Sequence, residues 1–306
     1  MHDEEVAKQA GDPFSPGTAN LVPSPRPSYG GPSPIRSQQI ALHLWGDAEA
    51  GEVADWIYVS NERIHHLVFG LPPGGAFRHS NDFRTIFAAD ELLYVLEGTL
   101  VIANPEIGEV HRLTAGEAVF FRRDTWHHAF SFGPDPLRVV EFFAPPPAAG
   151  ASSAYARTKE LLSASCYLDE RWLGGWPCRK EERHEAVTMH VARGDDDLLW
   201  EVLGANGDAL VGLYVSTEHL SAGRVELRSG GRTGTRVHGG DMSIHVLRGP
   251  LHVLLLDAHG PNGERWFELD ESEGFYLPIG TRYELFNITA HEVSALFAVA
   301  PEYRPA

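Results

Sequence analysis

The chain repeats itself, and this internal repeat limits the folds open to it more than any other feature. Tyr58-Val-Ser-x-Glu62 returns as Tyr214-Val-Ser-x-Glu218, and a Gly-Gly pair follows each tyrosine after 16 residues. A Val-Leu-x-Gly turn comes next in both copies, 40 residues after the first tyrosine and 35 after the second. Three matches in the same order are improbable by chance, so we interpret the 306-residue chain as a tandem duplication of one unit.

Each unit is predicted to consist of short β-strands. Apolar and β-branched runs alternate with turn residues, and the 31 Gly and 21 Pro suit the many turns that such strands need. This spacing favours an antiparallel sandwich or barrel over a βαβ arrangement. The runs lie at 56–60, 64–71, 92–103, 118–122, 127–132 and 137–144 in the first unit, and at 211–216, 222–228, 244–258, 265–269, 274–278, 283–288 and 293–300 in the second.

The segments outside the two units have different compositions. Residues 1–38 are rich in Pro, Ser and Gly and show no hydrophobic periodicity, which predicts a flexible tail or an arm that lies on this barrel or a neighbour's. A proline-rich stretch ends the first unit, and residues 154–163 are the best helix candidate. We therefore expect an arm (1–38), an N-terminal domain (39–146), a linker with a short helix (147–194) and a C-terminal domain (195–306).

Charge and composition exclude several classes of partner. The formal net charge of −17 argues against nucleic acid and anionic membranes, because both require a basic surface. No run of about 18 apolar residues could span a membrane, and no basic segment followed by an apolar run predicts a secretory signal. The two cysteines form no disulfide framework. The sequence therefore predicts a cytoplasmic protein.

Two fragments of the first unit carry side chains suited to chemistry. Glu91 begins a strand that leads to a turn glycine, Gly98, and Gly116 begins the strand that leads to His127. Alternate residues of a strand face opposite sides, so only one of His127 and His128 can face the same interior as Glu91. A carboxylate inside a barrel is costly unless it is paired or bound to a metal.

These fragments resemble the two motifs of the cupin superfamily, roughly G-x5-H-x-H-x3or4-E-x6-G and G-x5-P-x-G-x2-H-x3-N. Glu91-x6-Gly98 fits the first motif, and Gly116-x5-Arg122 followed by His127 keeps the spacing of the second. The resemblance covers about residues 40–145 and 195–302. It implies an all-β bicupin: two tandem double-stranded β-helix (jelly-roll) barrels. The paired-His element departs most from the pattern, since only His79 lies near it.

The resemblance also implies a divalent metal ion in the N-terminal barrel. Its expected ligands are His79, Glu91 and His127, a set that suits Fe(II) and also accepts Mn, Ni or Zn. The alternative is that no metal binds: His127 would then be a histidine whose ring is satisfied by hydrogen bonds, and Glu91 would lie on the surface. Further candidate ligands are Asp82, His65 and His66.

Three side chains near this site are candidates for substrate binding. Arg84, Arg122 and Trp126 could contact a carboxylate or an aromatic ring of a substrate. Exposed arginines more often have no role beyond lying on the protein surface, and this is the alternative for Arg84 and Arg122.

The second unit keeps the spacing of the motifs and loses their chemistry. Arg236, His238, Met242 and Tyr283 occupy ligand positions, but only His238 coordinates a metal well. We expect this barrel to be metal-free and structural. The alternative is an organic-ligand pocket in which Arg236, His238 and Tyr283 bind an anion.

The favoured function is that of a metal-dependent enzyme acting on a small organic acid or aromatic metabolite, with dioxygenase-type oxidation ahead of Mn- or Zn-dependent isomerase, lyase or hydrolase chemistry. The alternative is a non-catalytic cupin that binds a small ligand or a metal. Fold alone does not separate these classes. We expect a monomer with pseudo-twofold symmetry or a homodimer, and the residues do not identify the substrate.

Overall fold

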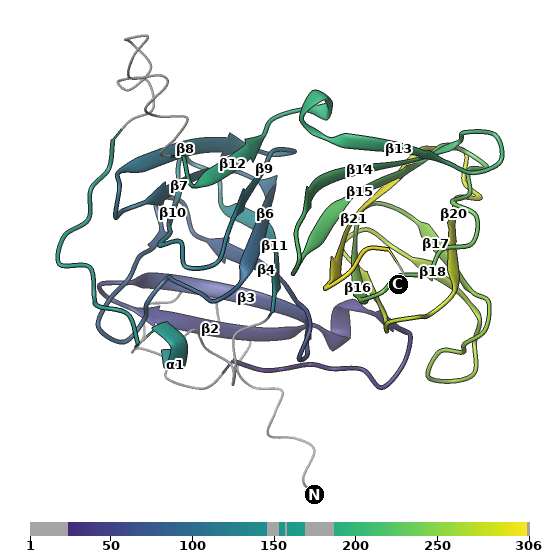
Figure 1. Cartoon of the computed structure of the whole chain (residues 1–306), viewed down its shortest axis with the longest axis horizontal. Helices are drawn as coiled ribbons and strands as arrows, with labels where there is room; N and C mark the ends of the chain where they lie inside the picture. Colours follow the sequence, from purple (N-terminus) through teal and green to yellow (C-terminus); the bar gives the residue numbers. More distant parts are fainter. Residues whose placement is uncertain (1–23, 146–152, 157, 169–186, 305–306) are drawn as a thin grey trace, which may run out of the picture.

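Short antiparallel strands form two β-barrels that lie side by side (Figure 1). The computed structural model describes residues 24–145, 153–156, 158–168 and 187–304. The N-terminal barrel contains the β2–β11 strands, and the C-terminal barrel contains β13–β21, so each sequence repeat forms one barrel. This confirms the expected all-β architecture with two barrels.

The N-terminal barrel has a seven-stranded and a four-stranded sheet. Its strands are β2 (Ala41–Asp47), β3 (Gly51–Ser60), β4 (His65–Leu71), β5 (Ala76–Phe77), β6 (Asp90–Glu97), β7 (Thr99–Asn104), β8 (Glu109–Thr114), β9 (Ala118–Phe121), β10 (His128–Ser131) and β11 (Leu137–Ala144), with β12 (Met189–Ala192) added from the linker. The strand orders are β12-β9-β6-β11-β4-β3-β2 and β5-β10-β7-β8.

The C-terminal barrel repeats this plan with a seven-stranded and a three-stranded sheet. Its strands are β13 (Leu199–Leu203), β14 (Ala209–Ser216), β15 (Ser221–Leu227), β16 (Asp241–Arg248), β17 (Leu251–Leu255), β18 (Trp266–Leu269), β19 (Gly274–Leu277), β20 (Tyr283–Phe286) and β21 (Val293–Ala300), with β1 (Ser33–Ile35) added from the arm. The orders are β1-β19-β16-β21-β15-β14-β13 and β18-β17-β20.

Each half of the chain contributes one strand to the other barrel. β1, which precedes the N-terminal barrel, pairs with β19 of the C-terminal barrel. β12, which precedes the C-terminal barrel, pairs with β9 of the N-terminal barrel. A short 3-10 helix follows each of these strands, at Ser37–Gln39 and at Asp195–Asp197. The repeat therefore extends to the segments that precede both barrels.

The prediction of a linking helix over residues 154–163 is wrong. Among the described residues of this segment, only the single turn α1 (Ser153–Ala156) is helical. The amides of Thr158 and Lys159 donate to carbonyls three residues back, so the chain continues as turns. A helix of one turn is not stable alone. The helical periodicity of apolar residues in the sequence is weak evidence for a helix when no surface is known for its apolar face to pack against. No helix in the described residues is long and apolar enough to cross a membrane.

Among the described residues, three large hydrophobic clusters form the core, one inside each barrel and one between them. In β6, Leu93 and Val95 belong to the interior cluster, whereas Leu92 and Tyr94 belong to the cluster between the barrels. This alternation follows from the period of two along a strand. The two large sheets therefore bury one face in their own barrel and the other against the neighbouring barrel.

The turn between β6 and β7 explains why Gly98 stands in the motif. Gly98 has φ of +81°, a left-handed conformation that side chains rarely adopt. A Cβ atom at this position would lie 2.5 Å from the carbonyl oxygen of Pro136. Glycine is therefore required for the turn that sets the register of β6, and with it the position of Glu91.

We expect replacement of Ile35 by alanine to lower the free energy of unfolding by about 2–4 kcal/mol, because the Ile35 side chain on β1 is fully buried between the barrels. Urea unfolding measures the change. Ile279→Ala is the control, since Ile279 is 47% exposed and should lose well under about 1 kcal/mol. Equal losses in the two variants would contradict the docking of β1 on β19.

Candidate functional site

Glu91 and His127 meet inside the N-terminal barrel. Glu91 lies at the start of β6, beside Phe121 of β9 and Phe143 of β11. His127 immediately precedes β10, and its Nε2 atom lies 3.8 Å from Oε2 of Glu91. Both residues are 1% exposed. The structure therefore places these two motif residues on the same interior, as the strand alternation predicts.

Burial disfavours the charged form of both side chains of this pair. Burial lowers the pKa of His127 to about 4. Burial and, next, the nearby carboxyl of Glu141 raise the pKa of Glu91 well above its usual range. The 3.8 Å contact is thus not an ion pair, and Oε2 of Glu91 has no hydrogen-bond partner among the described residues.

The geometry fixes the tautomer of His127. Its Nδ1 atom lies 3.3 Å from the carbonyl oxygen of Thr125, which can only accept a hydrogen bond. Nδ1 therefore carries the proton of the neutral ring, and Nε2 presents a lone pair toward Glu91. The site offers a free acceptor nitrogen beside a free carboxyl oxygen.

Two further buried carboxyls accompany Glu91, and sequence reasoning missed both. The carboxyl of Glu141 of β11 lies close enough to that of Glu91 to help raise its pKa. Burial, followed by the charge of Asp55, raises the pKa of Glu141 to about 8. Asp55 of β3 accepts a hydrogen bond from Nε1 of Trp45 at 2.7 Å, and burial raises its pKa to about 7. Among the described ion pairs, none joins these carboxyls to a Lys or Arg.

A sequence signal for these two carboxyls does exist. In β11, Glu141 lies between Val139 and Phe143, which belong to the interior cluster. In β3, Asp55 lies between Val53 and Ile57, which belong to the same cluster. A single carboxyl at an inward position of an otherwise apolar strand is the pattern that could have identified each of them.

The positions of the paired histidines hold other residues. Counting back from Glu91 with the spacing H-x-H-x3-E gives Thr85 and Phe87. Phe87 stacks on the ring of His127, with centroids 5.5 Å apart. The carbonyl of Thr85 accepts from the amide of His127 at 3.0 Å, and its buried Oγ1 has no partner among the described residues. Two of the four usual metal ligands are thus replaced.

His79 does not join Glu91 and His127. Its Nδ1 lies 2.7 Å from Nε2 of His128, and Nδ1 of His128 lies 2.7 Å from the hydroxyl of Tyr167. His128 follows His127 along the strand and faces the opposite side, so a residue bound to His128 cannot share an ion with Glu91. The expected ligand set of three is therefore not assembled.

The remaining candidate ligands are also dispersed. Asp82 is exposed. His65 faces the barrel interior and stacks on Phe143, with centroids 4.5 Å apart. His66 faces the other barrel, where its Nδ1 lies 2.7 Å from the hydroxyl of Ser243. Within the described ranges, no group of three or more His, Cys, Asp or Glu could hold a metal ion. The donor set does not fit the metal centre that the motifs imply.

The three candidate substrate contacts are engaged elsewhere. Arg84 donates to the carbonyls of Ala156 and Lys159. Arg122 forms an ion pair with Glu218 and lies 3.3 Å from Asp90, which ties the two barrels together. Trp126 is buried in a small cluster with Ile86 and Ala156. All three side chains serve structural contacts in the described part of the chain.

The C-terminal barrel does bring together Arg236, His238 and Tyr283. Nε2 of His238 lies 2.6 Å from the hydroxyl of Tyr283, which contacts the sulfur of Met242 at 3.1 Å. Arg236 donates to the hydroxyl of Tyr303 at 3.1 Å. The cavity that these residues line has a volume of ≈ 10 Å³. That space holds about one water molecule, too little for an organic anion.

Comparisons with known proteins agree with this architecture. Residues 68–143 match the family model described as "Cupin domain", and no curated protein matches the sequence. A putative glyoxylate induced protein from Pseudomonas aeruginosa has a TM-score of 0.60 at 13% identity, covering 95% of this chain and 96% of its own. An oxalate decarboxylase from Lactobacillus farciminis, solved as a formate complex, has a TM-score of 0.55 at 13% identity, covering 93% and 90%.

A third solved structure concerns the Mn(II) centers of the Bacillus subtilis oxalate decarboxylase. It has a TM-score of 0.52 at 13% identity and covers 92% of this chain and 80% of its own. At such identities, structural similarity establishes the fold of this chain and assigns it neither a ligand nor a reaction.

Proposed function

Because the chain contains a cupin domain and folds as a bicupin, we propose that its N-terminal barrel carries out proton-transfer chemistry on a small neutral molecule. One observation carries the proposal. Glu91 and Glu141 bring two buried carboxyls together inside the barrel, without a basic partner among the described ion pairs, and Oε2 of Glu91 has no hydrogen-bond partner although it lies 3.8 Å from Nε2 of His127. Buried polar atoms of this kind normally have a partner, which a bound molecule would supply.

The two glutamates are suited to act as an acid and a base. Burial raises the pKa of both carboxyls, that of Glu141 to about 8. One carboxyl of the pair, once ionised, would remove a proton from the substrate, and the other, still protonated, would return one. Carboxyls whose pKa values are raised toward neutrality are a recurring basis of acid–base catalysis near neutral pH. Moving a proton from one atom of a substrate to another is an isomerisation, and it needs no oxidant or reductant.

The surroundings favour a neutral, flat molecule over an organic acid. The ring of His127 is surrounded by Phe77, Phe87 and Phe121, with centroid distances of 4.8–5.8 Å. Among the described ion pairs no Lys or Arg joins the buried carboxyls of this site, and the two candidate arginines are bound elsewhere, so a carboxylate would find no cationic partner in these contacts. Of the two substrate classes expected from the sequence, the aromatic metabolite suits this interior better than the organic acid.

Metal-dependent oxidation of the dioxygenase type is the second candidate. It is favoured by the convergence of Glu91 and His127, which would be the two protein ligands of a manganese or iron ion, and by the Mn(II) centers of a protein with the same fold. The residues at the paired-His positions, Thr85 and Phe87, count against it. A non-catalytic role in ligand binding stays a further alternative, and the cytoplasmic location and the monomer or homodimer stay predictions.

Exchange of substrate hydrogen with deuterated solvent tests the proposal. We expect the protein to exchange hydrogen into some members of a panel of neutral enolisable carbonyl compounds and phenols, followed by NMR. Glu141→Gln should reduce the rate by about 100-fold or more, because it removes one carboxyl of the pair. Glu52→Gln is the control, since Glu52 is an exposed residue of β3. Exchange that survives in Glu141→Gln contradicts the proposal, and activity abolished by a chelator favours the metal-dependent alternative.

A further inference from the structure

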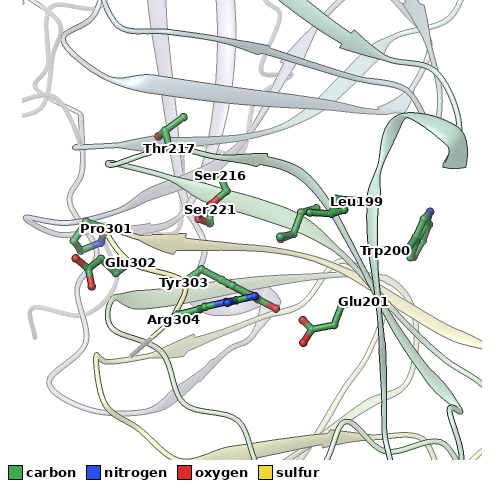
Figure 2. Close-up of a pocket in the computed structure, with 11 residues that line it drawn as sticks. Leu199, Trp200, Glu201, Ser216, Thr217, Ser221, Pro301, Glu302, Tyr303 and Arg304 are labelled. Carbon is green, nitrogen blue, oxygen red and sulfur yellow. Dashed lines mark hydrogen bonds between the residues drawn. The ribbon is translucent and has the colours of Figure 1, made fainter. Parts of the chain in front are cut away.

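A groove on the C-terminal half has no counterpart in the site described so far. It has a volume of ≈ 620 Å³ and lies where the beginning of β13, the end of β14 and the residues that follow β21 meet. Figure 2 shows Leu199 facing Tyr303 and Arg304, with Ser216 and Thr217 at the other end. Its size falls within the range of roughly 300–1,000 Å³ that is typical of ligand sites.

The corresponding place in the N-terminal half is occupied by the chain itself. The arm runs across the end of β3, where the amide of Ser60 donates to the carbonyl of Pro27 at 2.7 Å. Arg26 donates to the carbonyl of Asn61 at 3.0 Å. The hydroxyl of Tyr29 donates to a carbonyl of β3 at 3.1 Å. A proline-containing segment is thus bound through one backbone carbonyl and through the side chains of Arg26 and Tyr29.

The internal repeat relates these two places. Ser60 and Asn61 of the first copy align with Ser216 and Thr217 of the second. The contacts agree with the alignment, because Asn61 donates to Asp241 of the other barrel at 3.0 Å and Thr217 donates to Asp90 of the other barrel at 2.6 Å. Ser216 and Thr217 both line the groove. The groove in the second repeat therefore corresponds to the place at the end of β3 where the arm binds in the first repeat.

We propose that this groove binds an extended, proline-containing peptide segment of a partner protein, with the chemistry of residues 24–29. A polyproline II segment makes no internal hydrogen bonds, so its carbonyls are free to accept from the groove, as Pro27 accepts from Ser60. Apolar and aromatic walls suit proline rings, and here Leu199 and Tyr303 provide them. Glu302 at the rim offers a partner for an arginine of the segment.

The exposure of Leu199 supports a docking role. The side chain is 73% exposed, although leucine is usually buried. Val202 of the same strand is 65% exposed and does not belong to the lining of the groove. The two residues therefore give a matched pair of variants, because neither supports the core and only one lines the groove.

Binding of a synthetic peptide tests the proposal. The probe is a fluorescein-labelled peptide with the sequence Ser-Pro-Arg-Pro-Ser-Tyr of residues 24–29, titrated with the full-length protein and followed by fluorescence anisotropy. We expect saturable binding that Leu199→Glu weakens by about tenfold or more, since it places a charge in the apolar wall. Val202→Glu should bind as the unaltered protein does. A peptide with alanine in place of both prolines should bind more weakly.

Several results would overturn the proposal. One is an absence of saturable binding, and another is equal loss of binding in Leu199→Glu and Val202→Glu. Equal affinity for the alanine peptide would exclude recognition of the extended proline conformation. A concentration-dependent dimer that Leu199→Glu dissociates, measured by analytical ultracentrifugation, would instead identify a second copy of this chain as the occupant. None of these readouts depends on the chemistry proposed for Glu91 and Glu141.

Discussion

The free energy of unfolding at pH 8 should rise by about 4 kcal/mol when Asp55 is replaced by asparagine. The carboxyl of Asp55 is buried, and burial raises its pKa from 3.8 to about 7. Between these two values the folded protein keeps the proton that the unfolded chain releases. The contribution of the Asp55 carboxyl to the free energy of unfolding is therefore fully present below pH 3.8. It is lost as the pH rises through 7, at about 1.4 kcal/mol per pH unit.

Asparagine preserves the local structure of this site. Its side-chain oxygen can accept the hydrogen bond that Nε1 of Trp45 donates to Asp55, and its volume is nearly the same. The variant differs mainly in having no proton to release on unfolding. The same argument predicts that Glu141, with a pKa of about 8, adds to the loss of stability at alkaline pH.

Urea unfolding of the two proteins at pH 4, 6 and 8 measures the effect. The difference between Asp55→Asn and the unaltered protein should be small at pH 4 and largest at pH 8. The exposed Glu52, on the same strand, is the control, and Glu52→Gln should leave the pH dependence unchanged. A difference that does not grow with pH would show that Asp55 is ionised in the folded protein.

The second large effect concerns acid stability and the histidine between the barrels. His245 is 1% exposed, and burial lowers its pKa from 6.5 to about 3. Neither ring nitrogen has a hydrogen-bond partner among the described residues. Below pH 6.5 the unfolded chain binds a proton that the folded protein excludes. Stability from the neutral ring is therefore complete above pH 6.5 and is lost as the pH falls toward 3.

Replacing His245 by leucine should therefore stabilise the protein by about 3 kcal/mol at pH 4, because the variant has no side chain to protonate at this position. Removing two unpartnered nitrogens should add a smaller gain at every pH. The midpoint of acid unfolding, followed by tryptophan fluorescence, should shift to lower pH. His259→Leu is the control, since His259 is exposed. An unchanged midpoint in His245→Leu would contradict the burial of a neutral ring.

Together the two effects predict an unusual pH profile. The buried carboxyls lose stability as the pH rises, whereas the buried histidines His65, His127 and His245, whose pKa values are lowered to about 3 or 4, lose it as the pH falls. Between the ordinary pKa of a carboxyl and that of an imidazole, both groups affect stability: a rise in pH destabilises the protein through the buried carboxyls and stabilises it through the buried histidines. More buried histidines have a lowered pKa than buried carboxyls have a raised one, so we expect stability to rise with pH up to the ordinary pKa of an imidazole and to be maximal at about pH 6.5.

The sequence predicted the fold well because its signals are local or repeated. The alternation of apolar residues in β6 placed Glu91 on the inner face, and the motif glycine Gly98 fixed the turn that follows. The recurrence of Tyr58-Val-Ser at Tyr214 revealed two equivalent barrels before any contact was known. Period, turn chemistry and repetition are properties of short stretches, so a single sequence shows them directly.

The composition of the site was harder to predict, because it depends on contacts between distant strands. Glu91 meets Glu141 of another strand, and nothing local to either residue indicates this pairing. The proximity of His79 to Glu91 in the sequence predicts a shared site, yet in the fold the ring of His79 contacts His128 instead. The expected helix failed for a related reason, since helical periodicity over 154–163 does not show whether a surface exists for it to cover.

The exchange of β1 and β12 means that neither barrel is a self-contained folding unit. A chain cut between the two repeats would leave each fragment carrying a strand that belongs to its neighbour, and β9 and β19 would lose a bonded partner along one edge. Bare edges of this kind recruit other strands and promote aggregation. The halves should therefore be soluble when produced together and reassociate as a non-covalent pair, whereas either half produced alone should aggregate.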